Sequence, residues 1–138
     1  MSVDHMPLGD LGVTLRPVPG IYAVARLEPD AAIPAWFQGP GFAAMVRAGD
    51  ETTLVCLADR VPDGVTVDTP WACFRSVGPF DFQATGIVSA IVAPLSAAGL
   101  GVFVLCTFDG EHVLVAADHM QRAKQVLTAA GHHFAPAA

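Results

Sequence analysis

Charged side chains are scarce in this chain, and basic ones are the scarcest. Only 14% of the 138 residues are charged, and 7 Lys and Arg stand against 13 Asp and Glu, which gives a net charge of -6. A negative field repels phosphate backbones and anionic lipid surfaces, so neither nucleic acid nor a membrane is expected as a partner. Because 53% of the residues are hydrophobic, part of the apolar surface is expected to lie at a homodimer interface.

Cysteine pairs and an export signal are also lacking. The three cysteines, Cys56, Cys73 and Cys106, form no CxxC motif, and an odd number cannot pair completely within one chain. Each lies in an apolar run, which predicts buried thiols that pack in the core and do not act as nucleophiles. The first ten residues show neither the basic nor the apolar region of a signal peptide. Together these features predict a cytoplasmic protein.

A membrane span is not expected either. Residues 87–108 are uncharged over about the 20 residues that a span requires. However, Pro94, Gly99 and Gly101 interrupt the segment, and acidic residues flank it where a span would have Lys or Arg. The pattern instead predicts a buried helix, a tight turn and a buried strand.

Motifs typical of catalysis, metal binding and cofactor binding are missing. The chain has no glycine-rich phosphate loop, no Ser-His-Asp order and no paired-carboxylate motif. His132 and His133, with His112 and His119, form the one conceivable metal cluster. Adjacent residues on a strand point to opposite faces, so the pair is poorly placed to chelate one ion. The sequence therefore predicts no metal, no cofactor and no enzymatic activity.

Short β-rich runs dominate the first half of the chain. Pro17 and Pro19 predict a corner between two strands, and the Asp, Pro and Gly residues after the last run predict a connector. In chain order, the expected elements are two strands within residues 12–27, a turn or two of helix at 33–37, a hairpin of strands 42–46 and 53–57, and a connector at 59–70.

The sequence indicates where the first helix of the second half begins and ends. Apolar residues recur at helical spacing from Ile87, and Gly99 is expected just after the last turn. Pro94 lies inside this helix. Because proline has no N–H, it should kink the last turn and free the carbonyl of Ala90.

The second helix is expected to begin with a capping box. Asp118 would cap the N-terminus, and the side chain of Gln121, three residues later, would accept a hydrogen bond from the Asp118 backbone N–H. Gly131 would end the helix. Strands are expected around these helices at residues 71–77, 102–108, 112–116 and 132–135.

This β-α-β-β-α-β order predicts an α+β, ferredoxin-like fold, in which two helices cover one face of an antiparallel sheet. The strand at 102–108 is apolar at successive positions, so both of its faces should be covered. The first half would be a degenerate copy, giving modules at residues 1–65 and 66–138. The residues expected in the core are Ile91, Leu95, Val102, Val104 and Leu127.

A family resemblance supports this fold. The run GPFDFQATGIVSAIVAPLSAAGLGVFVLCTFDGEHVLVAADHMQRAKQVLTAAGH resembles the ACT-domain family. It is closest to the tandem ACT-like proteins related to the amino-acid-sensing regions of aspartate kinases and to the cytosolic arginine sensors of animal cells. The upstream pieces GIYAVARL, IPAWF, FAAMVRAGDETTLVCL and DRVP resemble the first module of small bacterial proteins of this group.

The resemblance implies paired ACT modules that often dimerise, bind effector amino acids and catalyse nothing. Its best-matching motif is DFxxxGI, residues 81–87, a loop that leads into a glycine-started helix. The chain departs from the family after the next strand. Relatives often carry a Thr-Asp-Tyr type of turn there, whereas this chain has Asp109-Gly110-Glu111-His112.

A ligand site is expected where that helix begins, because first-turn N–H groups are free donors that can bind a carboxylate. Acidic side chains could hold the amino group of the same ligand. Alternatively, Gly86 only lets the loop turn while Thr85 or Asp81 caps the helix, Asp109 only forms a turn, and Glu111 is a solvated charge. The candidate ligand-binding residues are Asp81, Phe82, Thr85, Gly86, Ile87, Val88, Phe103, Leu105, Thr107, Asp109 and Glu111.

These observations predict a non-catalytic regulatory protein that binds a small molecule, most simply an amino acid. The alternative is a structural module for oligomerisation or protein interaction that has no ligand. Ligand-dependent thermal stabilisation would separate the two, because only a bound ligand raises stability by mass action.

Overall fold

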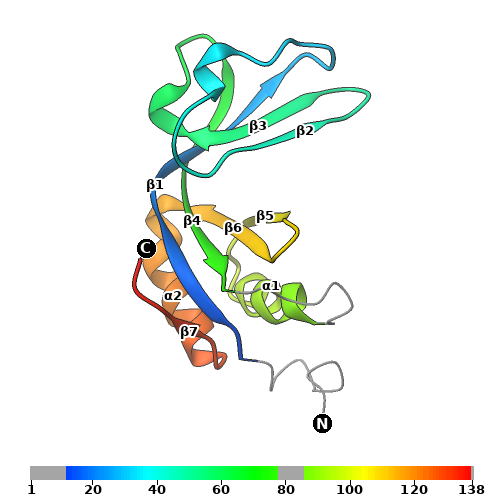
Figure 1. The fold of residues 1–138 in the computed structure, drawn as a ribbon. Coiled ribbons are helices and arrows are strands. Elements are labelled where there is room, and N and C mark those ends of the chain that lie inside the picture. Colours follow the sequence, from blue (N-terminus) through cyan, green and yellow to red (C-terminus); the bar gives the residue numbers. More distant parts are fainter. Residues whose placement is uncertain (1–11, 78–85, 138) are drawn as a thin grey trace. The chain divides into compact units, whose positions relative to one another are not determined.

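The computed structural model describes residues 12–77 and 86–137. The chain forms two compact units. Unit 1 contains the described residues up to Pro19 and those from Ala72 onward, and unit 2 is Gly20–Trp71. Two long strands, β1 (Thr14–Leu27) and β4 (Thr66–Ser76), each contribute residues to both units (Figure 1).

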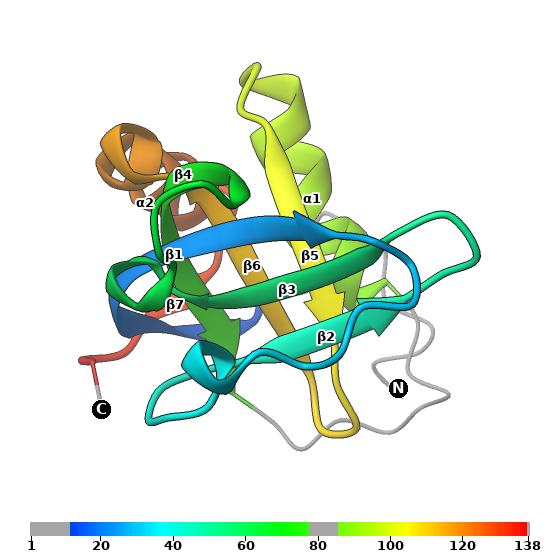
Figure 2. The ribbon, with the colours of Figure 1, turned by 90° about the horizontal axis from the view of Figure 1, so that it is seen from above.

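Unit 2 is a small antiparallel sheet with two single helical turns. β2 (Ala44–Arg47) and β3 (Thr52–Leu57) form the predicted hairpin, and β3 also pairs with the second half of β1 (Figure 2). The helical turns are the 3₁₀ helices η3 (Ala35–Phe37) and η4 (Ala58–Arg60). Every residue of unit 2 is described, and none of them is in an α-helix. The hairpin expected for a degenerate module is present as β2 and β3, and the expected short helix is present as the 3₁₀ turn η3.

Unit 1 contains the predicted β-α-β-β-α-β order, so the ferredoxin-like α+β fold is confirmed. After β4, the chain continues through elements whose order matches the expected one. They are α1 (Ile87–Ala97), β5 (Val102–Cys106), β6 (Glu111–Ala116), η5 (Ala117–His119), α2 (Met120–Ala129) and β7 (His133–Phe134).

The start of β1 is inserted into the sheet of unit 1. It pairs in parallel with β7, whereas the Val77 N–H donates to the Thr14 carbonyl, 2.9 Å away, from the side of β4. The strand order in unit 1 is therefore β7-β1-β4-β6-β5. Sheets that are antiparallel throughout were predicted, and the parallel pairing of β1 with β7 is a departure.

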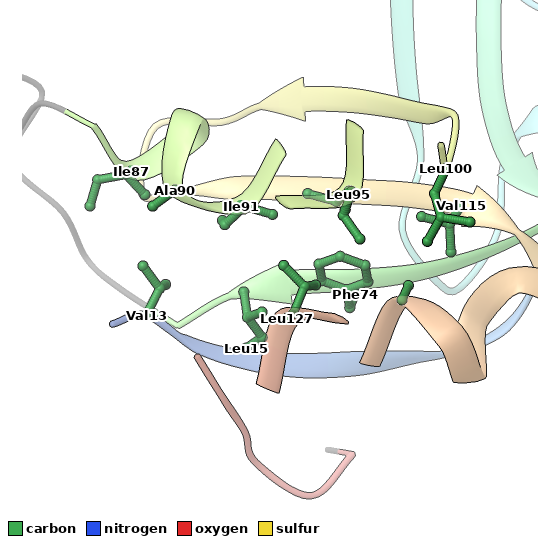
Figure 3. Close-up of a cluster of buried hydrophobic side chains, with 12 residues drawn as sticks. Val13, Leu15, Phe74, Ile87, Ala90, Ile91, Leu95, Leu100, Val115 and Leu127 are labelled. Carbon is green, nitrogen blue, oxygen red and sulfur yellow. The ribbon is translucent and has the colours of Figure 1, made fainter. Parts of the chain in front are cut away.

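The core of unit 1 lies between the sheet and its two helices (Figure 3). The predicted core residues Ile91, Leu95 and Leu127 are fully buried, and Val102 and Val104 pack against them half-buried. The buried cluster consists of Val13, Leu15, Phe74, Ile87, Ala90, Ile91, Leu95, Leu100, Val113, Val115, Ala123 and Leu127.

The prediction that β5 is covered on both faces was wrong for the chain by itself. Val102, Phe103, Val104 and Leu105 are half-buried, and Cys106 is exposed, contrary to its predicted burial. The reason is that β5 is the last strand of the sheet and pairs only with β6 on the path of strands.

Glycines end both helices as predicted. Gly99 has φ +78°, and the Leu100 N–H donates to the Leu95 carbonyl at 3.0 Å, which is the Schellman arrangement. Gly131 has φ +101°, and the His132 N–H likewise donates to the carbonyl of Leu127. Each glycine supplies a left-handed conformation that other residues adopt only with strain.

Two local predictions were wrong. α2 begins at Met120 after a 3₁₀ turn, and its N-cap residue His119 makes no side-chain capping bond. Asp118 lies inside that 3₁₀ turn, so it is not positioned as the N-cap of a capping box with Gln121. β1 is continuous, although Pro17 and Pro19 predicted a corner, because prolines two residues apart remove N–H groups from the same strand edge only.

The long uncharged segment forms the predicted helix, turn and strand. Within residues 12–77 and 86–137, no helix is long and apolar enough to cross a membrane. The predicted domain boundary at residues 65 and 66 lies just before β4, whereas the compact units divide β1 and β4 internally. The division of the chain into two modules at that boundary stays a prediction.

Candidate functional site

One end of unit 1 gathers the start of α1 and the ends of several strands. α1 and β5 run in opposite directions, so β5 ends near the point where α1 begins. The hairpin pairs Cys106 of β5 with Glu111 of β6, and Ser76 at the end of β4 is hydrogen-bonded to Glu111. Figure 3 shows Ile87 and Val13 at this end of the core and Leu100 and Val115 at the other.

The start of α1 has a glycine as its N-cap residue. Gly86 is the N-cap residue, with φ 83° and ψ 0°, and its carbonyl accepts the Ala90 N–H at 2.8 Å. Gly86 has no side chain, so it makes no side-chain capping bond itself. Ile87, 7% exposed, is part of the core, and Val88 is 38% exposed. The first turn can therefore present N–H groups and the positive end of the helix dipole to an anion.

Glu111 carries a buried carboxylate at the same end of the unit. Its side chain is 9% exposed, so the alternative of a solvated charge was wrong. The Ser76 hydroxyl donates to Glu111 Oε2 at 2.7 Å and accepts the Glu111 N–H at 2.9 Å. The single proton of the Ser76 hydroxyl is thus donated to the carboxylate. A carboxylate held in this way is a strong acceptor for an ammonium group.

Thr107 and Asp109 lie in the turn between β5 and β6. The N–H and the hydroxyl of Thr107 both donate to the Gly110 carbonyl, at 2.7 and 3.0 Å. Thr107 therefore closes the turn. Asp109 is exposed in the same turn, which agrees with its alternative reading as a turn residue.

Two predicted ligand residues lie on the other face of the sheet. Val102 and Val104 of β5 pack against the core under the helices, so the alternating residues Phe103 and Leu105 point away from it. The structure therefore separates these two side chains from the start of α1. Asp81, Phe82 and Thr85 lie outside the described residues. Ligand binding at the remaining candidates stays a prediction.

Comparisons with known proteins agree with this architecture. A model of the ACT domain matches residues 66–129, and a model of an N-terminal domain from similar proteins matches residues 20–64. A crystal structure of a protein from Agrobacterium tumefaciens is 43% identical, covers 93% of this chain and 96% of its own, and superposes with a TM-score of 0.88. The chain belongs to the family of small tandem ACT-like proteins.

More distant structures share the fold of this ACT-like protein. A Vibrio cholerae protein of unknown function, described as a possible transport protein, is 18% identical, with a TM-score of 0.72 over 90% of this chain and 92% of its own. The aspartate kinase of Clostridium acetobutylicum, described as an allosteric enzyme, is 16% identical, with a TM-score of 0.61 over 81% of this chain and 33% of its own. No curated protein matches the sequence.

Sequence reasoning missed a pocket in the ACT-like protein. A pocket of about 380 Å³ lies between α1 and the end of α2 and is lined mostly by small residues. His132, which is 4% exposed, forms part of its wall. The one signal for it was Pro94, which was predicted to free a carbonyl in α1. The lining residues are Ser89, Ala90, Ala93, Pro94, Ala129, Ala130 and His132.

The thiols and histidines of the ACT-like protein show little reactive chemistry. Cys56 and Cys73 are buried, as predicted. Burial raises the pKa of the Cys73 thiol to about 12, so it stays protonated near neutral pH. Within residues 12–77 and 86–137, no three His, Cys, Asp or Glu side chains are grouped so that they could hold a metal ion.

Proposed function

We propose that this ACT-like protein is a non-catalytic cytoplasmic regulator that binds an amino acid, or a similar zwitterion, at one end of unit 1. ACT-domain membership supports a regulatory, ligand-binding role. A cytoplasmic location is supported by the buried thiols of Cys56 and Cys73, which are unpaired in the structure.

The observation that carries the proposal is a buried carboxylate at the same end of the unit as a helix start whose N-cap residue is a glycine. An amino acid has a carboxylate and an ammonium group a few ångströms apart. The N–H groups of the first turn of α1 would donate to the ligand's carboxylate, and the Glu111 carboxylate would accept hydrogen bonds from its ammonium group. Ser76 holds the Glu111 side chain in place by hydrogen bonds. Binding would therefore cost little of that side chain's conformational entropy.

Calorimetry of the full chain with each of the twenty standard amino acids tests the proposal. A hit is then repeated with Val88→Glu, which places a carboxylate in the first turn. This variant should weaken binding by about tenfold or more through like-charge repulsion, while the helix dipole favours its folding. Ala97→Glu puts the same charge at the exposed far end of α1 and should leave binding unchanged.

A second variant addresses the ammonium group. Glu111→Gln keeps the shape of the side chain but removes its charge, so it should weaken binding of an amino acid and spare binding of its deaminated carboxylate analogue. Gly86→Val is a poorer test, because φ 83° strains any side chain at that position. If all twenty amino acids fail at millimolar concentration, or if Val88→Glu binds normally, the proposed site is wrong.

A homodimer is the second proposal, and a module that only oligomerises remains the alternative function. Two observations favour an interface on unit 1. β5 is the last strand of its sheet, and Phe108, in the turn after it, is 77% exposed. Light scattering at micromolar concentration should give twice the mass of one chain. A monomer mass that does not change on dilution would exclude the dimer.

A further inference from the structure

Arg60 of unit 2 has a buried guanidinium group without an acceptor. It is the last residue of η4, and its Nη1 and Nη2 atoms are both buried with no hydrogen-bond partner among the described residues. Arginine stays protonated in proteins, so this group is always charged. Leaving a buried charged donor unpaired is costly, which is why such donors usually have a carboxylate, phosphate or carbonyl partner.

A glycine strap, Gln38–Gly41, covers this guanidinium. A Cβ atom at Gly39 would lie 2.9 Å from Cζ, 3.0 Å from Nη2 and 3.1 Å from Nε of Arg60. The flat face of the guanidinium therefore lies directly against the Gly39 backbone, and a side chain at this position would require the guanidinium to shift. Gly39 also has φ +146°, which favours glycine independently.

The strap is held at its ends and exposed along its length. The Gln38 N–H donates to the Ala35 carbonyl at 3.2 Å, and the Phe42 N–H donates to the Tyr22 hydroxyl oxygen at 3.2 Å. All four strap residues, Gln38–Gly41, are exposed, and the strap has positive φ at Gly39 and Gly41. Two glycines that flank one proline give this short segment two points at which it can hinge.

The charge of Arg60 acts inside unit 2. Burial raises the pKa of the Cys56 thiol, and the positive charge of Arg60 opposes that rise. The adjacent acid, Asp59, is exposed and makes no ion pair with Arg60 that would satisfy the buried nitrogens. The guanidinium is therefore a cation whose partner the described residues do not supply.

We propose that Arg60 and the strap Gln38–Gly41 form a binding site for a small oxyanion, a carboxylate or a phosphate. When the strap lifts, two oxygens of the anion would bond Nη1 and Nη2 side by side, the geometry for which a guanidinium is suited. The net charge of -6 disfavours a polyanion and favours a small ligand with one anionic group. This site lies in unit 2 and does not depend on the amino-acid site proposed in unit 1.

Titration of the full chain with sodium acetate and, separately, with inorganic phosphate tests the proposal. The ionic strength is held constant with chloride, and the amide signals of Gly39 and Gly41 and the Arg60 Nε–H signal are followed by NMR. At least one anion should shift these signals saturably, and the anion that does so identifies the ligand chemistry. Arg60→Gln should weaken the binding by about tenfold or more. Arg26→Gln, which removes an exposed arginine from the same unit, should leave it unchanged.

Arg60→Leu distinguishes a binding role from a packing role. If the guanidinium is an anion-binding group, replacing it by an apolar side chain should keep or raise Tm in anion-free buffer. The same replacement should abolish any rise of Tm on adding the anion. If the guanidinium only supports the strap, Arg60→Leu should lower Tm whether or not the anion is present, and the proposal is then wrong. No saturable shift with either anion, or equal affinity in Arg60→Gln, would also overturn it.

Discussion

His132 donates a hydrogen bond from Nε2 to the carbonyl oxygen of Ala90, 2.6 Å away. The acceptor is open because Pro94, four residues later in α1, has no N–H to give it. The other ring nitrogen, Nδ1, accepts the Val13 N–H at 3.0 Å, so the ring must carry its proton on Nε2. One buried imidazole therefore joins the end of α2 to α1 and to the segment that leads into β1.

Replacing His132 by Phe should destabilise the protein by about 2–4 kcal/mol. The substitution keeps an aromatic ring but leaves the Ala90 carbonyl and the Val13 N–H unpaired in buried positions, and each unpaired group costs about 1–3 kcal/mol. Urea unfolding followed by circular dichroism measures the change. A loss below about 0.5 kcal/mol would show that the two bonds contribute little to the net stability.

The proline makes this prediction specific. In Pro94→Ala, the new N–H can bond the Ala90 carbonyl along the helix, so His132→Phe should cost about 1 kcal/mol less in that background. A double-mutant cycle of the four proteins measures the difference. Equal costs in both backgrounds would mean that His132 does not act through the carbonyl that the proline frees.

The three thiols should differ in reactivity. Cys106 is exposed, whereas Cys56 and Cys73 are buried and burial raises the pKa of both. Because the thiolate is the reactive form, a disulfide reagent at pH 8 should modify one thiol quickly in the native protein and all three in guanidinium chloride. Cys106→Ser should remove the fast phase. Fast reaction of two or more thiols in the native protein would contradict the buried placement.

The raised pKa of Cys73 also predicts a loss of stability in alkali. The thiol has pKa 9.0 in the unfolded chain and about 12 in the folded protein. Between these values the unfolded state has lost the proton and the folded state keeps it, so stability falls as the pH rises from 9 toward 12. The free energy of unfolding of Cys73→Ala should fall less steeply over this range than that of the wild type. Parallel curves would contradict the assignment.

Local signals in the sequence predicted most of unit 1. Gly99 and Gly131 predicted where α1 and α2 end, because a left-handed residue after a helix is a property of a few neighbouring residues. The insertion of β1 between β7 and β4 could not be predicted in this way. It depends on pairing between Thr14 and His133, residues far apart in the chain, and the pattern of a strand does not name its neighbours.

The candidate site was predicted in part for the same reason. The start of α1 at a glycine N-cap follows from Gly86 and its neighbours. The burial of Glu111 does not, because it depends on Ser76 of a strand that is 35 positions away in sequence. Phe103 and Leu105 were assigned to the site because they lie in the strand that leads into the turn at Asp109. Alternate residues of a strand point to opposite faces of the sheet. Because Val102 and Val104 face the core under the helices, Phe103 and Leu105 lie on the other face.

His112 should make the protein lose stability in acid. Burial, together with the positive charge of Arg75, lowers the pKa of His112 from 6.5. Below 6.5 the unfolded state takes up a proton that the folded state resists, so stability falls as the pH drops from 6.5 through the folded pKa. In His112→Gln this part of the pH dependence should disappear. An unchanged profile would exclude His112 as its source.

The role of Arg75 in that shift can be measured separately. Arg75→Gln removes the neighbouring positive charge but not the burial, which is the larger cause of the shift. The pKa of His112, followed by NMR of its ring protons, should therefore move part of the way back toward 6.5. A pKa that does not move would mean that burial alone lowers it.

Ser76→Ala should show how strongly the Glu111 carboxylate depends on the Ser76 hydroxyl. The substitution removes the hydroxyl that donates to Oε2 and accepts the Glu111 N–H, and both groups are buried, so the free energy of unfolding should fall by about 2–3 kcal/mol. Adding Glu111→Leu removes the stranded carboxylate and should recover more than half of this loss, because an apolar side chain needs no partner. If the double variant is less stable than Ser76→Ala, another group must stabilise the carboxylate, and Ser76 is not what holds it.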